Sequence, residues 1–233
     1  MAFPNSKQAK QAINNSVLKE LDCKMRDLDR CFNHYGSYNL KGFKDNFDYD
    51  FFVKNKGMSE FACNEVDQYQ RPLIGRALLS NTTIGSGRAK GTPQYKGSIF
   101  DSGHLLGHLL IGGIKDFDSR KTNKDNIVPQ TSWANQGNFS LYTQRGNSQQ
   151  AYEHFVLGNI KKAWKNKITL KVYYQVEAVY GSEIERVPRG VIIQAVSNLP
   201  DYLDKGIHVF IPNVQEHGGK VSYLKWDDSI NMR

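Results

Sequence analysis

Cysteine is scarce in this sequence of 233 residues: only Cys23, Cys31 and Cys63 occur, and none belongs to a CxxC pair. They allow at most one internal disulfide and supply no recognisable zinc site. There is no apolar run of the length that a membrane span needs, and the polar residues 1–10 do not resemble a signal peptide. We therefore expect no membrane span. The remaining options are secretion or cell-surface display, with a targeting segment that is absent from this chain, or a cytoplasmic location.

Acidic residues are also in deficit, with 23 Asp and Glu against 31 Lys and Arg, a formal net charge of +8 and a pI near 9.3. An excess of positive charge suits a polyanionic partner, because each neutralised phosphate releases condensed counterions. Many basic proteins bind no nucleic acid, so the charge by itself makes nucleic acid one leading option. The chain is long enough to bury a core in one large domain or two small ones.

Internal repeats and low-complexity tracts are absent as well, so hydrophobic periodicity indicates the organisation. Residues 8–32 carry apolar side chains at three- and four-residue steps, which predicts one amphipathic helix. The aromatic, Asn/Asp/Gly-rich stretch over 32–57 has no period and predicts a connector. We expect an N-terminal helical extension over residues 1–57 and a second domain over residues 58–233.

From Phe61 onward the pattern favours strands. Residues 61–67 and 73–79 are typical of a hairpin with turn residues between them, and a Gly-rich loop follows over 85–97. A helix is predicted over 148–165, and alternating apolar residues over 170–180 are typical of a half-buried strand. Further strands are predicted at 190–197, 207–212 and 221–224. Together these segments predict an α+β fold with a central, mostly antiparallel sheet flanked by helices.

Residues that suit metal-assisted hydrolysis gather in the segment 100–136. His104 is a natural general base, because an unperturbed imidazole titrates close to neutral pH. Asp125, Asn126 and Asn135 carry oxygen atoms of the kind that suit a hard cation such as Mg²⁺. Each has a plainer alternative: a lone histidine is more often a packed core residue, and Asn135 could cap a helix.

A basic loop lies between these positions, with Lys115, Arg120, Lys121 and Lys124 among Gly, Asp and Ser residues. Such a loop could bind phosphate groups. A solvated surface is the plainer alternative.

The combined pattern resembles the DNA/RNA non-specific endonuclease family, the ββα-metal nucleases, with particular similarity to bacterial nucleases of DNA uptake and related secreted or toxin nuclease domains. Family members carry Asp-Arg-Gly-His, then Asn-x-x-x-Gln, then a helical Asn about thirty residues beyond the histidine. The matching residues here are Asp101 to His104, Asn126 to Gln130, and Asn135. The likeness extends over roughly residues 66–224.

The resemblance implies a ββα-metal core and a Mg²⁺-dependent endonuclease, with Mn²⁺ as a substitute metal. It implies that His104 deprotonates the attacking water and that Asn126 belongs to the catalytic residues. It also implies that Asn135 binds the metal and that Glu153, on the next helix, orders water around it. A surface glutamate at the rim is the alternative for Glu153. The implied partners are DNA, with RNA as a further option, and an inhibitor protein if the chain is a toxin.

One position departs from the family pattern, because Ser102 stands where the family has arginine. That arginine is associated with positioning or neutralising the phosphate. Arg88, Arg120, Lys121 and Arg145 are the candidates to replace its charge as substrate-binding residues.

Two other functions compete with the nuclease. A nucleic-acid-binding homologue without catalysis is suggested by the substitution at Ser102. A zinc hydrolase is suggested by the H-x-x-x-H spacing of His104 and His108, although Leu105 stands where the metalloprotease motif needs glutamate.

Overall fold

The structure, a computed structural model, describes residues 4–33, 36–44, 59–95, 100–137, 148–203, 206–217 and 220–223. Its α-helices are α1 (Ser6–Ala9), α2 (Asn15–Glu20), α3 (Leu28–Cys31), α5 (His108–Ile111), α6 (Ser132–Asn135), α7 (Gln149–Lys165) and α8 (Pro200–Leu203), and its 3₁₀ helices are η1 (Lys10–Ala12), η2 (Met25–Asp27) and η3 (Lys124–Asn126). Its strands are β1 (Tyr38–Asn39), β2 (Phe61–Val66), β3 (Pro72–Leu79), β4 (Asp101–His104), β5 (Ile127–Gln130), β6 (Val172–Val179), β7 (Gly190–Ser197), β8 (Ile207–Pro212), β9 (Val214–His217) and β10 (Lys220–Tyr223).

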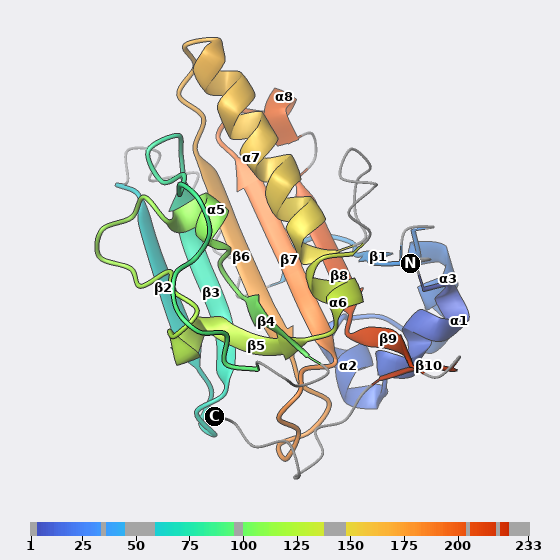
Figure 1. Ribbon diagram of the computed structural model, residues 1–233. Helices are drawn as coiled ribbons and strands as arrows, with labels where there is room; N and C mark the ends of the chain where they lie inside the picture. The colour runs from blue at the N-terminus through green and yellow to red at the C-terminus, as the bar shows by residue number, and fades with distance from the viewer. Residues whose placement is uncertain are drawn as a thin grey trace.

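A six-stranded sheet with the order β1-β8-β7-β6-β3-β2 forms the centre of the fold (Figure 1). Every neighbouring pair of strands in it is antiparallel. The predicted α+β class with a mostly antiparallel sheet is therefore confirmed. The predicted hairpin corresponds to β2 and β3, whose turn places Gln70 in the left-handed region at a φ of 60°. Strands β7 and β8 have the predicted bounds, and β10 begins one residue early, with Leu224 outside the described residues.

One face of the sheet is covered by α7, which lies across β6 and β7 in Figure 1. Ser148 caps this helix by accepting a hydrogen bond from the Ala151 N–H. The buried side of α7, including Val156 and Ile160, packs in one apolar cluster with Tyr174 and Val176 of the sheet. The same cluster contains Leu105 and Leu106, so the segment that follows β4 is packed against α7 and the sheet. The predicted helix at 148–165 is confirmed.

The other face of the sheet is covered by the N-terminal residues. Val17 and Leu28 pack against Val179, Ile192 and Phe210, which all project from that second face. The prediction that the strand at 170–180 is half-buried is therefore wrong, because every residue of β6 is buried. On one face Tyr174 and Val176 pack in the cluster with α7; on the other, Val179 packs against the N-terminal residues and Tyr173 packs with neighbouring strands.

The predicted single helix over residues 8–32 is also wrong, because the chain forms the short helices α1, η1, α2, η2 and α3 instead. Asn14 adopts an extended conformation and its side chain accepts from the Val17 N–H, so it starts a new helix rather than continuing one. Asp22 then reverses the chain at a φ of 45°. The apolar periodicity survives these breaks because Ala9 of α1, Val17 of α2 and Leu28 of α3 still pack in the cluster on the sheet, whereas η2 buries no residue.

Residues before the predicted boundary contribute to the main sheet, because β1 pairs with β8 through Tyr38 and Phe210. Most of the predicted connector, residues 45–58, lies outside the described residues, so a domain boundary at 57/58 stays a prediction. The three cysteines are free thiols. Among the helices in the described part of the chain, none combines the length and apolarity needed to cross a membrane.

Leu28→Ala tests whether the N-terminal residues fold together with the sheet. Leu28 is 0% exposed in the cluster on the second face, so we expect the free energy of unfolding to fall by about 2–5 kcal/mol. Urea unfolding followed by circular dichroism measures it, with the half-exposed Met25→Ala as a control of small effect. A second, unchanged transition for the sheet would show instead that the N-terminal residues form an independent unit.

Candidate active site

Antiparallel pairing of β4 with β5 brings the two sequence motifs together. In this pairing Asp101 lies opposite Gln130, and His104 lies opposite Ile127, directly after Asn126. Gly103 is required at this point, because a Cβ there would collide with the Gln130 side chain. Strand β5 continues into α6, where the Thr131 side chain caps the helix that ends at Asn135.

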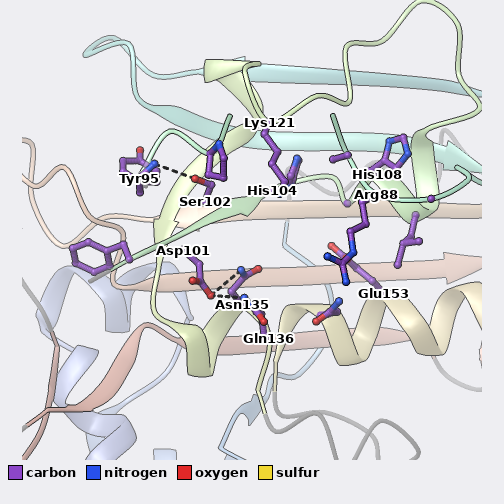
Figure 2. Close-up of a pocket in the computed structure, with 17 residues that line it drawn as sticks. Arg88, Tyr95, Asp101, Ser102, His104, His108, Lys121, Asn135, Gln136 and Glu153 are labelled. Atoms are coloured by element: carbon purple, nitrogen blue, oxygen red, sulfur yellow. Dashed lines mark hydrogen bonds between the residues drawn. The ribbon is translucent and has the colours of Figure 1, made fainter. Parts of the chain in front are cut away.

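His104, Asn135 and Glu153 line one cavity of about 720 Å³. They come from β4, α6 and α7. Figure 2 shows His104 and Lys121 across this cavity from Asn135, with Arg88 and Glu153 toward one end. Since a water molecule takes up about 30 Å³ of liquid, the cavity has room for a phosphodiester group together with several waters.

His104 is held as a neutral imidazole. Burial, assisted by the positive charge of Lys121 and by His108, lowers the pKa of His104 to about 4. Its Nε2 is sealed from solvent and has no hydrogen-bond partner within the residues that the structure describes. The ring is therefore unprotonated across the whole neutral pH range.

Asn135 is oriented by an aspartate from the neighbouring strand. The Asp101 carboxylate accepts hydrogen bonds from Asn135 Nδ2 at 3.2 Å and from Gln136 Nε2 at 2.8 Å. Because the amide nitrogen of Asn135 faces Asp101, the oxygen Oδ1 faces the opposite side, as Figure 2 shows. Asn135 is the last residue of α6 rather than a helix cap, so the alternative of a capping role is wrong.

Glu153 is a buried carboxyl group at the cavity wall, with 7% of its surface exposed. Burial raises its pKa to about 7, an effect that the hydrogen bond from Gln149 Nε2 to Oε1, at 3.0 Å, partly opposes. Gly107 packs directly against the carboxylate, and a Cβ at that position would collide with it. The alternative of a solvated rim glutamate is therefore wrong.

Asn126 does not line the cavity. It is 0% exposed, and its Oδ1 accepts from the Leu106 N–H at 2.9 Å and from Asn64 Nδ2 at 3.1 Å. Its Nδ2 donates to the Leu106 carbonyl at 3.0 Å. Its amide is engaged in fixing the turn that follows His104, so the structure shows a positioning contact for Asn126, and its catalytic role stays a prediction.

The four candidate cations separate into different environments. Lys121 and Arg88 line the cavity. Arg120 instead forms an ion pair with Asp118 at 2.8 Å on the surface, and 63% of its side chain is exposed. Arg145 lies outside the described residues. Ser102, at the position of the family arginine, accepts a hydrogen bond from the Tyr95 N–H at 3.1 Å and supplies no charge.

The two histidines of the H-x-x-x-H spacing do not share a helix, because His104 ends β4 and His108 begins α5. His108 Nδ1 lies 2.9 Å from the Ser119 hydroxyl and its Nε2 lies 3.2 Å from the Ser86 carbonyl. Both ring nitrogens are therefore engaged away from His104. The described residues contain no group of three His, Cys, Asp or Glu side chains that could hold a metal. A zinc hydrolase, which needs about three such ligands, is not supported.

Gln149 is a functional residue that the sequence did not reveal. Its Nε2 donates to the carbonyls of His104 and Leu105 as well as to Glu153, and its Oε1 accepts from Gln130 Nε2 at 2.9 Å. This amide, 2% exposed, links the backbone carbonyl of His104 to the carboxylate of Glu153. Asp101 was expected only as a position of the motif, and its hydrogen bond to Asn135 could not be inferred from the motif.

Comparison with known proteins agrees with this arrangement. The family model for DNA/RNA non-specific endonucleases matches residues 68–226 of the chain. The protein belongs to the DNA/RNA non-specific endonuclease family, and is accordingly a nuclease of the hydrolase class.

The fold is similar to that of NucA from Streptococcus agalactiae. The magnesium-bound NucA structure has a TM-score of 0.61 at 22% sequence identity, with 82% of this chain and 89% of NucA covered. The metal-free NucA structure has a TM-score of 0.62 at 22% identity, with 91% of this chain and 100% of NucA covered. At this identity the likeness shows the shared ββα-metal fold.

Glu153→Gln tests the burial of a charge at the site. The pKa of Glu153 rises from 4.5 to about 7, which corresponds to about 3 kcal/mol against the charged form. Below pH 4.5 both the folded and unfolded states hold the proton, so there is no penalty; the penalty grows as pH rises and is complete above about pH 7. We expect the variant to be more stable by about 3 kcal/mol at pH 8, with EDTA present, and unchanged at pH 4.

Urea unfolding at the two pH values measures this difference. Glu183→Gln, at an exposed position, is the matched control and should show little change at either pH. Equal stabilisation of Glu153→Gln at both pH values would assign the gain to something other than the buried charge.

Proposed function

We propose that the protein is a Mg²⁺-dependent endonuclease that hydrolyses phosphodiester bonds of DNA, and of RNA, with little sequence preference. The observation that supports this most is the convergence of His104, Asn135 and Glu153 on one cavity that also contains Lys121 and Arg88. A site that holds the sugar–phosphate backbone between cations reads charge and shape rather than base edges. Contacts of this kind predict little sequence preference and a binding affinity that falls steeply as the salt concentration rises.

The donor atoms present fit a hard divalent cation. No described residue donates to Asn135 Oδ1, and the carboxylate of Glu153 lines the same cavity. Oxygen ligands of this kind suit Mg²⁺, with Mn²⁺ as a substitute, and Mg²⁺ commonly binds through one or two protein oxygens and several waters. A magnesium ion is also present in one NucA structure, which has the same fold. A bound Mg²⁺ would stabilise the negative charge that develops on the phosphate and the leaving oxygen.

The proton of the attacking water would pass to His104. Because Nε2 is sealed from solvent, Nδ1 is the ring nitrogen that can meet water in the cavity. Its low pKa keeps the imidazole unprotonated and ready at neutral pH. Asn135 Oδ1 would bind the metal, in the orientation that Asp101 enforces. Glu153 would accept hydrogen bonds from water on the same wall and so order it.

His104→Ala and Asn135→Ala test these roles through degradation of plasmid DNA in the presence of Mg²⁺. We expect loss of the general base to lower the cleavage rate by about 10²–10⁴-fold at any metal concentration. We expect loss of the amide ligand to weaken metal affinity, so that raising the Mg²⁺ or Mn²⁺ concentration restores part of the activity of Asn135→Ala alone.

EDTA provides the control. Chelation of the metal should lower DNA cleavage by the unmodified protein at least as much as the His104→Ala substitution does. Undiminished cutting by His104→Ala would remove the histidine from the mechanism. DNA binding without any cutting by the unmodified protein would favour the non-catalytic homologue, the alternative that the substitution at Ser102 suggests.

Lys121 and Arg88 are proposed to supply the charge that Ser102 lacks. We expect Lys121→Ala and Arg88→Ala each to lower kcat/KM by about 10²-fold, the usual effect of removing one donor that stabilises the transition state. Arg120→Ala is the matched control and should retain nearly full activity, because Arg120 is paired with Asp118 outside the cavity. An equal loss of kcat/KM for Arg120→Ala would show that the net charge of the protein determines the rate, rather than the position of Lys121 and Arg88 in the cavity.

Secretion or display at the bacterial surface, and an inhibitor protein in the event that the chain is a toxin, stay predictions. A cytoplasmic location is the alternative.

A further inference from the structure

An exposed tryptophan stands at the C-terminal end of α7. Trp164 has 62% of its surface exposed, whereas Trp133 has only 6%. Exposed lysines surround it in sequence, and we call this group the lysine–tryptophan surface: Lys161, Lys162, Trp164, Lys165 and Lys167. The sequence contains no Asp or Glu from residue 154 to residue 176, so nothing along this stretch offsets the positive charge.

Helix stability explains only part of this composition. Lysines in the last turn of a helix are favourable because they oppose the partial negative charge at its C-terminus. That effect accounts for Lys162 and Lys165, but it gives no reason for an exposed indole.

The position of Lys167 is also not explained by stability. Lys167 adopts a φ of 59° directly after the helix cap, and its N–H donates to the Trp164 carbonyl while the Ile168 N–H donates to that of Ala163. Glycine is the usual residue at this left-handed position, and a lysine there costs about 1 kcal/mol.

Trp164 and the cavity residue Glu153 belong to the same helix, whereas Lys161 and Lys165 leave α7 at roughly 80° and 120° from the direction of Glu153 and so flank the indole on one side. Trp164 follows Glu153 by eleven residues, close to three full turns, so both side chains leave the helix in nearly the same direction. At 1.5 Å per residue they are separated by roughly 16 Å along the axis. This equals about five nucleotides of a stacked strand, or fewer of an extended one.

We propose that the lysine–tryptophan surface binds a single-stranded segment of the nucleic acid whose phosphodiester occupies the cavity. This inference rests on the proposed function, since it concerns the same substrate. An indole stacks on an unpaired base, whereas the bases of a duplex are already stacked on each other. Lys161 and Lys165 flank the indole and bind the phosphates. The surface therefore favours single-stranded DNA or RNA over duplex, and does so without reading sequence.

Trp164→Ala tests the stacking contact in a His104→Ala background with EDTA present, so that no strand is cut. The probes are a fluorescein-labelled thymidine 12-mer and a 12-base-pair duplex, and binding is measured by anisotropy. We expect Trp164→Ala to weaken single-strand binding by about five- to tenfold and to leave duplex binding unchanged. Trp164→Phe should restore most of the affinity. Ile184→Ala, a change at a 90% exposed apolar residue elsewhere, should have no effect.

Lys161→Ala/Lys165→Ala tests the phosphate contacts in the same assay. We expect the slope of log affinity against log salt concentration for the single strand to become shallower by roughly 1.4, since each lost phosphate contact accounts for about 0.7. Lys19→Ala/Lys24→Ala removes the same charge from the exposed N-terminal surface and should leave the slope unchanged.

Several results would overturn this inference. They are unchanged single-strand binding by Trp164→Ala, an equal loss on the duplex, or Trp164-dependent binding to phosphatidylserine vesicles with no effect on the oligonucleotide. A failure here is distinguishable from a failure of the proposed function. If the protein with His104 intact cuts DNA while Trp164→Ala binds normally, only the lysine–tryptophan surface is lost. If it cuts nothing in Mg²⁺, the proposed function fails whatever the binding result.

Discussion

The geometry of the site depends on one buried amide. Gln149, in the first turn of α7, donates to the backbone carbonyl of His104 and to the carboxylate of Glu153, and accepts from Gln130. It therefore joins β4, β5 and α7 beside His104 and Glu153. A buried amide without partners is costly, so each of these bonds restrains the others. These hydrogen bonds fix the backbone at His104 relative to the Glu153 carboxylate, and Gln149 itself does not line the cavity.

Burial acts in opposite directions on the two titratable groups. It lowers the pKa of His104 to about 4 and raises that of Glu153 to about 7, because the charged form is disfavoured in both cases. Besides the Asp101 carboxylate, the cavity lining carries the two cations Lys121 and Arg88, a balance that suits a polyanionic substrate. Neither cation comes from the strand on which the family places its arginine. Both lie in loops on either side of β4, and under the proposed function they would supply the positive charge that Ser102 lacks.

Elements bounded by strong local signals could be predicted from the sequence, and roles that depend on burial could not. Strand β7, which begins at Gly190, was predictable because its run of apolar residues is long. The prediction of one long N-terminal helix was wrong because Asn14 caps a new helix, a feature that hydrophobic periodicity does not detect. Asn126 and Asn135 are the same residue type, so the sequence could not distinguish their environments. The amide of Asn126 is hydrogen-bonded to the Leu106 backbone, whereas Asn135 lines the cavity. Gln149 was missed because a polar residue in a first helical turn is usually solvated.

Helix α7 imposes a fixed spacing on any substrate that the cavity and the lysine–tryptophan surface share. Its buried side is locked onto the sheet through Val156 and Ile160, so Glu153 and Trp164 cannot shift along the axis relative to each other. A strand held at both points must bridge roughly 16 Å. A flexible single strand can adjust its path to that span, whereas a stiff duplex presents its phosphates only along its own helical course. The rigidity of one helix would then discriminate between substrates by shape, with no base contacted by hydrogen bonds.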